Sequence, residues 1–599
     1  MAAPLALLLA ACPDSGETTT ASTQATGDPT EGTGAGPGGD PTGAGPTGSA
    51  TDGPTGAGPG GDPTTVDPTD GPTTSDPTTD GPDPGPIVEP GDPGSGDVTF
   101  TIRADTDRHP ISPWIYGTNQ YDDLATTNRG LGLVRQGGNR MTAYNWENNA
   151  SNAGADYQHQ NDDYLASQLG VDGDIPGEVV RAATAEALDA GADMLVTVPI
   201  CGYVAADKDG GGDVNQTPIT SRRASTRPSP ARTARSTATP IRTTTPSTRT
   251  SSSPGCNPIP DAFYPERARV LFSLDNEPDL WSHTHERIHP DPVGYAELVD
   301  KNAEFAAAIK DVAANAIVAG FVSYGYGGYT TLQDAPDAQG EFISYYLQAM
   351  AEAEAQEGHR IVDVLDLHWY TEVYANGQRI TGDDNSPESV EARVQAPRSL
   401  WDDSFHEDSW IANDVLQGPV RLIPWLKERI DAHYPGTGLG FTEYNYGGGG
   451  HISGAIAQAD VLGIFGREGV TMAAYWALTD QTSMIWAAFR AFTSYDGQGS
   501  KFGDTSISAV TSDVAATSVY ASTDVADPAR TVIVAINKTA GPLTAAVTLA
   551  AYADYPSVAV WQLTGPQPEL TAGPAVSPTA TNAFLYEMPA YSVSVLVPQ

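Results

Sequence analysis

The chain is poor in cysteine and in basic residues, and each shortage excludes a class of protein. Three cysteines in 599 residues are too few for a scaffold held together by disulfides. Lys and Arg number 31 against 75 Asp and Glu, which gives a formal net charge of -44. This charge argues against nucleic acid or an anionic membrane surface as a partner. A neutral polymer is compatible with it, although acidity alone also keeps an exported protein soluble.

The first eleven residues are apolar but too few to span a bilayer, so they are typical of an export signal. Small residues lead directly to Cys12, a pattern that resembles the lipobox of bacterial lipoproteins, in which the cysteine sulfur carries lipid. Residues 1–12 are thus predicted to be a lipoprotein-type signal. No Lys or Arg precedes the apolar run, a departure from such signals that points to a start codon further upstream. An ordinary secretory signal with an incidental cysteine is the alternative. Both interpretations predict an extracellular or cell-surface protein. In the lipoprotein interpretation, which we favour, the protein touches the membrane only through a lipid on Cys12.

Residues 13–97 are rich in Thr, Gly, Pro, Ser and Asp, with near-repeats such as GAGPGGDPT. They offer too little apolar surface to offset the entropy of ordering, so we predict a disordered linker. Residues 215–255 are also irregular, with seven arginines and no acidic residue. A local frameshift, a basic interaction loop and a disordered insertion all fit this segment; we favour the frameshift because so long a structureless loop is rare. Cys201 and Cys256 flank it and are candidates for a disulfide.

Apolar runs alternate with amphipathic helical patterns between residues 111 and 500, of which 178–190 and 295–314 are the clearest. Such alternation with eight strands predicts an α/β fold, a (β/α)8 TIM barrel. The candidate strands are residues 114–119, 133–139, 193–200, 269–276, 316–323, 364–370, 439–445 and 472–478.

Residues 501–599 instead contain closely spaced β-rich runs separated by turn residues. They predict a C-terminal antiparallel β-sandwich. Residues 98–110 begin with the alternating run VTFTIRAD, which we expect to complete this domain because chain ends often meet. The sandwich is expected to pack against the barrel, and carbohydrate binding is the alternative.

Two glutamates follow apolar strands. Residues 270–274 stop at Asp275-Asn276-Glu277, and residues 438–447 carry Glu443 in the same way. In an α/β barrel, the carboxyl ends of the strands form the active site. A glycosidase that retains configuration needs one carboxyl group as acid/base and a second, about 5 Å away, as nucleophile. We assign Glu277 to the first role and Glu443 to the second, although either residue alone is more often a solvated side chain.

Other polar and aromatic side chains near strand ends would support these two. Asn276 would hold the sugar 2-hydroxyl, provided the strand end twists, because neighbours on a regular strand face opposite ways. Arg135 would keep the nucleophile ionised by its charge. His368 and Tyr370 share a strand face and would hydrogen-bond the nucleophile, with a core position as the alternative for the histidine. The remaining candidates for sugar contact are Asn139, Trp146, Trp281 and Trp476.

Four motifs, in residues 134–157, 272–281, 366–372 and 441–469, resemble glycoside hydrolase family 44. The similarity covers residues 98–599 except 215–255. The resemblance implies a retaining endo-β-1,4-glucanase that acts on cellulose-like glucans, xyloglucan or glucomannan, with Glu277 as acid/base and Glu443 as nucleophile. It implies no organic cofactor and allows a structural calcium ion whose ligands the sequence does not identify. We expect a monomer; a catalytically impaired carbohydrate-binding surface protein is the alternative.

Overall fold

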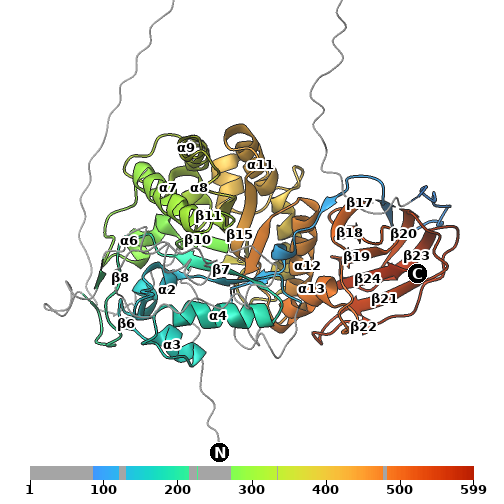
Figure 1. Ribbon diagram of the computed structural model, residues 1–599. Coiled ribbons are helices and arrows are strands. Elements are labelled where there is room, and N and C mark those ends of the chain that lie inside the picture. Colours follow the sequence, from blue (N-terminus) through green and yellow to red (C-terminus); the bar gives the residue numbers. More distant parts are fainter. Residues whose placement is uncertain (1–84, 120–129, 215–224, 227–270, 334, 477–481) are drawn as a thin grey trace, which may run out of the picture. The chain divides into compact units, whose positions relative to one another are not determined.

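A computed structural model describes residues 85–119, 130–214, 225–226, 271–333, 335–476 and 482–599 (Figure 1). These residues form two parts. One is a barrel of parallel strands surrounded by helices, and the other is a curled β-sheet. None of the described helices is long and apolar enough to cross a bilayer.

Eight parallel strands close into the predicted TIM barrel, and each predicted run supplies one of them. The first strand is shorter than expected because Pro113–Ile115 forms a 3-10 turn, η1, capped by the Ser112 side chain. Proline suits the first helical position, where no amide N–H is needed. In barrel order the strands are β3 (Gly117–Thr118), β4 (Leu133–Gln136), β7 (Asp193–Val198), β10 (Leu271–Leu274), β11 (Ile317–Ser323), β12 (Val364–Tyr370), β15 (Gly438–Asn445) and β16 (Met472–Tyr475).

The two predicted helices are present as α4 (Glu178–Asp189) and α7 (Tyr295–Val312). α12 (Ile452–Arg467) is apolar on nearly all sides, as expected of a helix that is buried all round. It contacts α13 and also strands of the C-terminal sheet. The other helices are α2 (Asn139–Thr142), α3 (Tyr164–Leu169), α6 (Trp281–Thr284), α8 (Tyr326–Thr331), α9 (Phe342–Glu357), α10 (Pro387–Gln395), α11 (Leu422–His433) and α13 (Ser483–Thr493), with short η turns at Gly154–Tyr157, Pro278–Leu280, Ala396–Leu400 and Ile411–Leu416.

The N-terminal strand β1 (Val98–Arg103) completes the C-terminal domain, as predicted. It lies between β17 (Thr505–Thr511), to which it is antiparallel, and β20 (Leu543–Ala550), to which it is parallel, so the sheet is mixed. β17 pairs with β18 through its first half and with β1 through its second half, which carries it between the two layers of the curled sheet. The other strands are β18 (Thr517–Thr523), β19 (Thr531–Asn537), β21 (Val558–Leu563), β22 (Thr571–Ala572), β23 (Ala583–Met588) and β24 (Ser592–Pro598).

The end of the predicted linker belongs to this sheet. Val88 forms a β-bridge with Ala551, and Ile87 packs on the sheet's apolar core. The predicted boundary at residue 97 is therefore too late, because two apolar side chains within the Pro- and Gly-rich sequence find a surface to cover. Short two-stranded pairings complete the description: β2 (His109–Pro110) on β17, β5 (Ser151–Asn152) with β6 (Asn161–Asp162), β8 (Val204–Ala205) with β9 (Ser225–Thr226), and β13 (Tyr374–Ala375) with β14 (Gln378–Arg379).

Several predictions lie outside the described residues. They are the signal with Cys12, the linker up to residue 84, and residues 215–255 except β9. Cys201 is buried, and its predicted partner Cys256 also lies outside the described part of the chain. The disulfide and the lipid anchor therefore stay predictions.

Candidate active site

The chain leaves the extended conformation directly after β10. Asp275 has φ 74°, and Glu277 has φ 45° and ψ 58°, both in the left-handed region. The Asp275 carboxylate holds this turn, because it accepts hydrogen bonds from the amides of Ile200 (2.5 Å) and Cys201 (3.0 Å) and from Thr142 Oγ1 (2.7 Å). This is the twist that the sequence required if two consecutive side chains after the strand were to reach one pocket.

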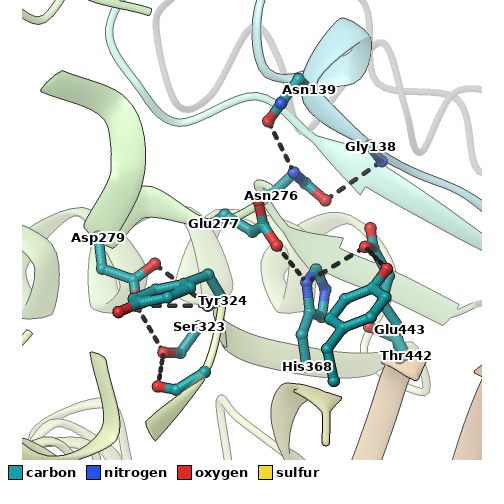
Figure 2. A network of polar contacts seen from close by, with 12 residues as sticks. Gly138, Asn139, Asn276, Glu277, Asp279, Ser323, Tyr324, His368, Thr442 and Glu443 are labelled. Atoms are coloured by element: carbon teal, nitrogen blue, oxygen red, sulfur yellow. Dashed lines mark hydrogen bonds and ion pairs between the residues drawn. The ribbon is translucent and has the colours of Figure 1, made fainter. Parts of the chain in front are cut away.

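The amide of Asn276 is fixed at three points (Figure 2). Its Oδ1 accepts from Arg135 Nη2 (2.9 Å) and from the Gly138 amide (3.2 Å). Its Nδ2 donates to Asn139 Oδ1 (3.1 Å), and Asn139 Nδ2 donates in turn to Asp156 Oδ2 (2.8 Å). The chain of bonds defines which end of each amide is oxygen, and one of the two N–H groups on Asn276 Nδ2 is left over for a ligand.

Glu443, near the end of β15, is a buried carboxylate with two strong donors. Arg135 Nη1 lies 2.8 Å from its Oε1, and the Tyr370 hydroxyl donates to its Oε2 at 2.8 Å. The same Arg135 nitrogen donates to Asn119 Oδ1 at 2.9 Å. A buried ion pair is stable only when its remaining hydrogen-bonding groups are satisfied, and here both carboxylate oxygens are.

His368, on β12, lies between the two glutamates (Figure 2). Its Nδ1 is 2.8 Å from Glu277 Oε1 and 3.5 Å from Glu443 Oε2. One oxygen of each carboxyl group and this nitrogen all lie within 4.8 Å of one another. The closer partner is thus Glu277, whereas the sequence suggested the nucleophile. Burial lowers the pKa of His368 to about 3, so the ring is neutral near pH 7.

The carboxyl group of Glu277 is protonated far more easily than an ordinary glutamate. Burial raises its pKa to about 7; the positive charge of Arg135 opposes this rise and the negative charge of Asp156 adds to it. Loss of solvation is thus the largest cause of the raised pKa of Glu277. A neutral His368 contributes no positive charge that would cancel it.

Comparison with known proteins agrees with this geometry. Residues 150–373 match the model of glycoside hydrolase family 44. Endoglucanase A of Paenibacillus lautus is 40% identical over 84% of this chain and 73% of its own length. The chain belongs to glycoside hydrolase family 44. A Paenibacillus polymyxa xyloglucanase of the family, solved with xyloglucan, has a TM-score of 0.74 and 37% identity over 84% of this chain and 99% of its own. The beta-mannanase/endoglucanase A of Caldicellulosiruptor saccharolyticus is 38% identical over 83% of this chain and 38% of its own length.

The three tryptophans predicted to contact sugar in this family 44 chain lie in different surroundings. A Cβ on Gly138, whose φ is 81°, would come within 2.8 Å of the Trp476 ring, so this ring lies directly over the turn after β4. Trp281 is fully buried, and its Nε1 donates to Asp275 Oδ1 at 3.3 Å. The prediction that Trp281 stacks on a sugar is wrong, because its ring supports the turn from beneath. Trp146 is partly buried and packs against the barrel core.

Two aspartates of the site were not identified as such from sequence. Asp279 accepts from Ser323 Oγ (2.5 Å) and from the Tyr324 amide (3.3 Å), and burial raises its pKa to about 7. Asp366 lies on the β12 face together with His368, and its Oδ2 accepts from Thr442 Oγ1 at 2.9 Å. Alternation along β12 places Asp366 on the same face as His368, but nothing in the sequence around Asp279, in the 3-10 turn Pro278–Leu280, signals that its carboxylate is buried.

Glu277, His368 and Glu443 also form the only group among the described residues with metal-ligand spacing. Calcium prefers six to eight oxygen ligands. An imidazole nitrogen and the adjacent Arg135 guanidinium do not fit such an ion. The structural calcium that the family allows therefore has no fitting site in this group, and the chemistry below uses the side chains alone.

Proposed function

We propose that this family 44 hydrolase cleaves internal bonds of β-1,4-glucans by double displacement, with Glu443 as nucleophile and Glu277 as acid/base. The supporting observation is the separation of the two carboxyl groups, since one oxygen of Glu277 and one oxygen of Glu443 lie within 4.8 Å of each other. Retaining glycosidases hold their carboxyl groups about 5–5.5 Å apart, whereas inverting ones leave about 6.5–9.5 Å for a water molecule.

In the first step, the ionised Glu443 attacks the anomeric carbon while the protonated Glu277 donates its proton to the leaving glycosidic oxygen. Arg135 and Tyr370 hold the attacking carboxylate in place through its two oxygens. The remaining N–H of Asn276 is available for the sugar 2-hydroxyl, a contact that strengthens as the oxocarbenium-like transition state forms.

In the second step, Glu277 has become a carboxylate and removes a proton from the water that attacks the glycosyl-enzyme ester. The bond to Glu443 breaks, the sugar is released with its original configuration, and both carboxyl groups return to their starting states. A pKa of about 7 suits Glu277 for both halves, since it exchanges its proton readily near neutral pH.

The relatives support cellulose-like glucans, xyloglucan and mannan-containing polymers as substrates. All are uncharged, which agrees with a chain whose net charge is -44. We further propose that the protein is an exported monomer, tethered by lipid on Cys12, and that it needs no organic cofactor.

The direct test incubates the full chain with carboxymethylcellulose, xyloglucan and glucomannan and measures new reducing ends. Proton NMR of the first products should show the β-anomer before mutarotation. A first product in the α form would refute double displacement. No reducing ends from any polymer would support the alternative, a carbohydrate-binding protein without catalysis.

Glu443→Gln should abolish turnover but leave oligosaccharide binding, because the amide keeps the shape and one acceptor oxygen for Arg135 and loses the nucleophilic charge. Loss of activity by more than about a thousandfold is expected for removal of a nucleophile. Calorimetric titration with cellotetraose measures the binding. Glu304→Gln, an exposed carboxylate on α7, is the control and should keep full activity. Normal turnover in Glu443→Gln would remove the assignment.

A further inference from the structure

The strands β17 and β18 of the curled sheet enclose an opening between them. Among the described residues, their pairing covers only Thr505 to Ile507 on β17. The opening closes again further along, where the hydroxyls of Thr511 and Thr517 are hydrogen-bonded at 2.6 Å. Residues 508–510 line one side of it, and residues 518–520 line the other. The result is a short gap in the sheet that is closed at both ends.

Side chains of the barrel part cover this gap and complete a groove of about 420 Å³. The wall on the barrel side consists of Asp107, His109, Trp401, Arg467 and Glu468. The volume lies within the range of small-molecule sites, about 300–1,000 Å³. α12 starts beyond Glu443 and runs for 16 residues, about 24 Å, before it reaches the groove at Arg467. The groove is therefore separate from the active site.

Arg467 supplies the groove with a hydrogen-bond donor that has no acceptor. Its guanidinium carbon lies 4.1 Å from the centre of the Trp401 ring, and its Nε donates to Glu468 Oε1 at 3.0 Å. These two contacts fix the plane of the guanidinium group. Its Nη2 is buried and has no hydrogen-bond partner among the described residues. Because a buried donor without an acceptor is costly, an oxygen atom of a ligand would be stabilised at this nitrogen.

The backbone of the two strands adds polar groups to the gap. The amides of Ser508 and Ser512 donate to the carbonyls of Thr106 and Thr99, on the side of β17 that faces β1. Since neighbouring residues of a strand direct their N–H and C=O groups to opposite edges, the backbone groups of Ala509 face the gap. They can exchange hydrogen bonds with the hydroxyl groups of a ligand.

The same argument applies to β18. The Ala516 carbonyl accepts from the Lys538 amide, on the side of β18 that faces β19. Alternation along the strand then directs the backbone groups of Val519 into the gap, opposite those of Ala509. The gap thus offers donors and acceptors on both sides, with the exposed apolar side chain of Val510 at its rim.

These features fit an uncharged sugar better than an anion or a peptide. The charge of Arg467 is already balanced by Glu468, and Asp107 lies on the same wall, so the groove is not positive. An extended peptide cannot pass between the strands, because both ends of the gap are closed. A sugar unit is compact, and each of its hydroxyl groups both donates and accepts hydrogen bonds. Its C–H groups suit the apolar side chain of Val510.

We propose that this groove is a second glucan-binding site, which holds a short stretch of β-1,4-glucan that the active site does not cleave. The inference rests on the proposed function, which supplies the class of ligand. A polymer held at the groove keeps its other segments near the protein, so their effective concentration at the active site rises.

The test titrates cellotetraose into the full chain carrying Glu443→Gln, which should bind the sugar without cleaving it, and measures the heat of binding. Two sites per chain are expected. Two further changes are then added singly to this parent chain: Ser508→Trp fills the gap, and Arg467→Met removes the unpartnered donor. Either should weaken the second site by roughly tenfold or more and leave the first unchanged. Each variant checks the other, and thermal unfolding shows which are folded.

Ser577→Trp is the matched control, because Ser577 is exposed in the loop between β22 and β23 and lies outside the groove. It should keep both sites. Fewer than two sites in the parent chain, or two unaltered sites in the folded groove variants, overturns the inference. Binding of tetragalacturonate in place of cellotetraose at the groove also overturns it, because the ligand would then be an anion.

The proposed function is tested separately, by turnover of the wild-type chain on the polymers. If the wild-type chain releases reducing ends but the parent chain shows one site, the inference fails and the proposed function stands. If the wild-type chain releases none, the proposed function fails. Loss of one of two cellotetraose sites in the Ser508→Trp chain would still support the groove in that case.

Discussion

At the scale of single residues, two glutamates of identical chemistry are set to opposite tasks by their neighbours. Glu443 faces a guanidinium and a phenol that stabilise its charge. Glu277 is buried beside a histidine that stays neutral, and it keeps its proton up to about pH 7. In glycosidases, the surroundings of two carboxyl groups give them different pKa values. The group that keeps its proton acts as the acid, and the ionised group acts as the nucleophile.

The first prediction concerns pH. Because the acid must be protonated and its pKa is raised from 4.5 to about 7, kcat/KM should be high below pH 7 and fall as the pH rises through 7. Asp156→Asn removes a negative charge that contributes to the rise, so the falling limb should move to lower pH. Initial rates on xyloglucan between pH 4 and pH 9 measure both. A limb that does not move in the variant contradicts the role of Asp156.

The sequence contained the residue types of the site but not their pairing. Glu277, Glu443 and Arg135 could be placed because each ends an apolar strand, and barrel geometry brings strand ends together. The preference of His368 for Glu277 depends on differences of less than an ångström, 2.8 Å against 3.5 Å, which no spacing along the chain encodes. Trp281 carries an indole like that of Trp476, and only packing separates the fully buried ring of the first from the partly exposed ring of the second.

At the scale of elements, the decisive feature is how β10 stops. Its apolar run was visible in the sequence, as was the polar break after Leu274. The hydrogen bonds that hold Asp275 come from separate segments, among them α2, the end of β7 and α6, so no local pattern could predict them. The same reason applies to the parallel pairing of β1 with β20, which depends on residues at opposite ends of the chain.

Replacing Asp275 by Ala should therefore damage catalysis more than stability. The left-handed turn loses its central acceptor, so Asn276 and Glu277 drift from the pocket, and misplacement of about 1 Å costs roughly a hundredfold in kcat. Several buried donors lose their partner, which should destabilise the fold by about 1–3 kcal/mol. Steady-state rates and thermal unfolding measure the two effects. Asp300→Ala, an exposed position on α7, is the control. A fully active Asp275→Ala would show that the turn holds itself.

At the scale of the whole molecule, the barrel and the curled sheet share a buried polar contact. Asp460 of α12 forms an ion pair with Lys538, which follows β19, at 2.7 Å, and accepts from the Tyr520 hydroxyl of β18 at 2.6 Å. Both charged side chains are almost completely buried. α12 directly follows the segment that carries Glu443, so the sheet supports the helix behind the nucleophile.

Lys538→Met should strongly destabilise the protein, because it leaves the Asp460 carboxylate buried without its counter-charge. The loss expected for one partner of a buried pair is about 3–5 kcal/mol. Activity and tryptophan fluorescence should then be lost together in one thermal transition, at a lower temperature than in the wild type. Glu89→Gln, in an exposed pair with Arg103, should barely change the transition. Separate transitions for the two parts would contradict this coupling.

The position of β1 inside the sheet has a consequence for biosynthesis. Asp97, beside this strand, is hydrogen-bonded to Thr544, a residue 447 positions later. A ribosome releases the amino end first, so the two edges of β1 stay without partners until β17 and β20 have emerged. A truncated product would carry a bare strand edge open to aggregation or proteolysis. A polypeptide that stops before β20 therefore leaves β1 without its parallel neighbour, and the fold itself separates such fragments from longer products.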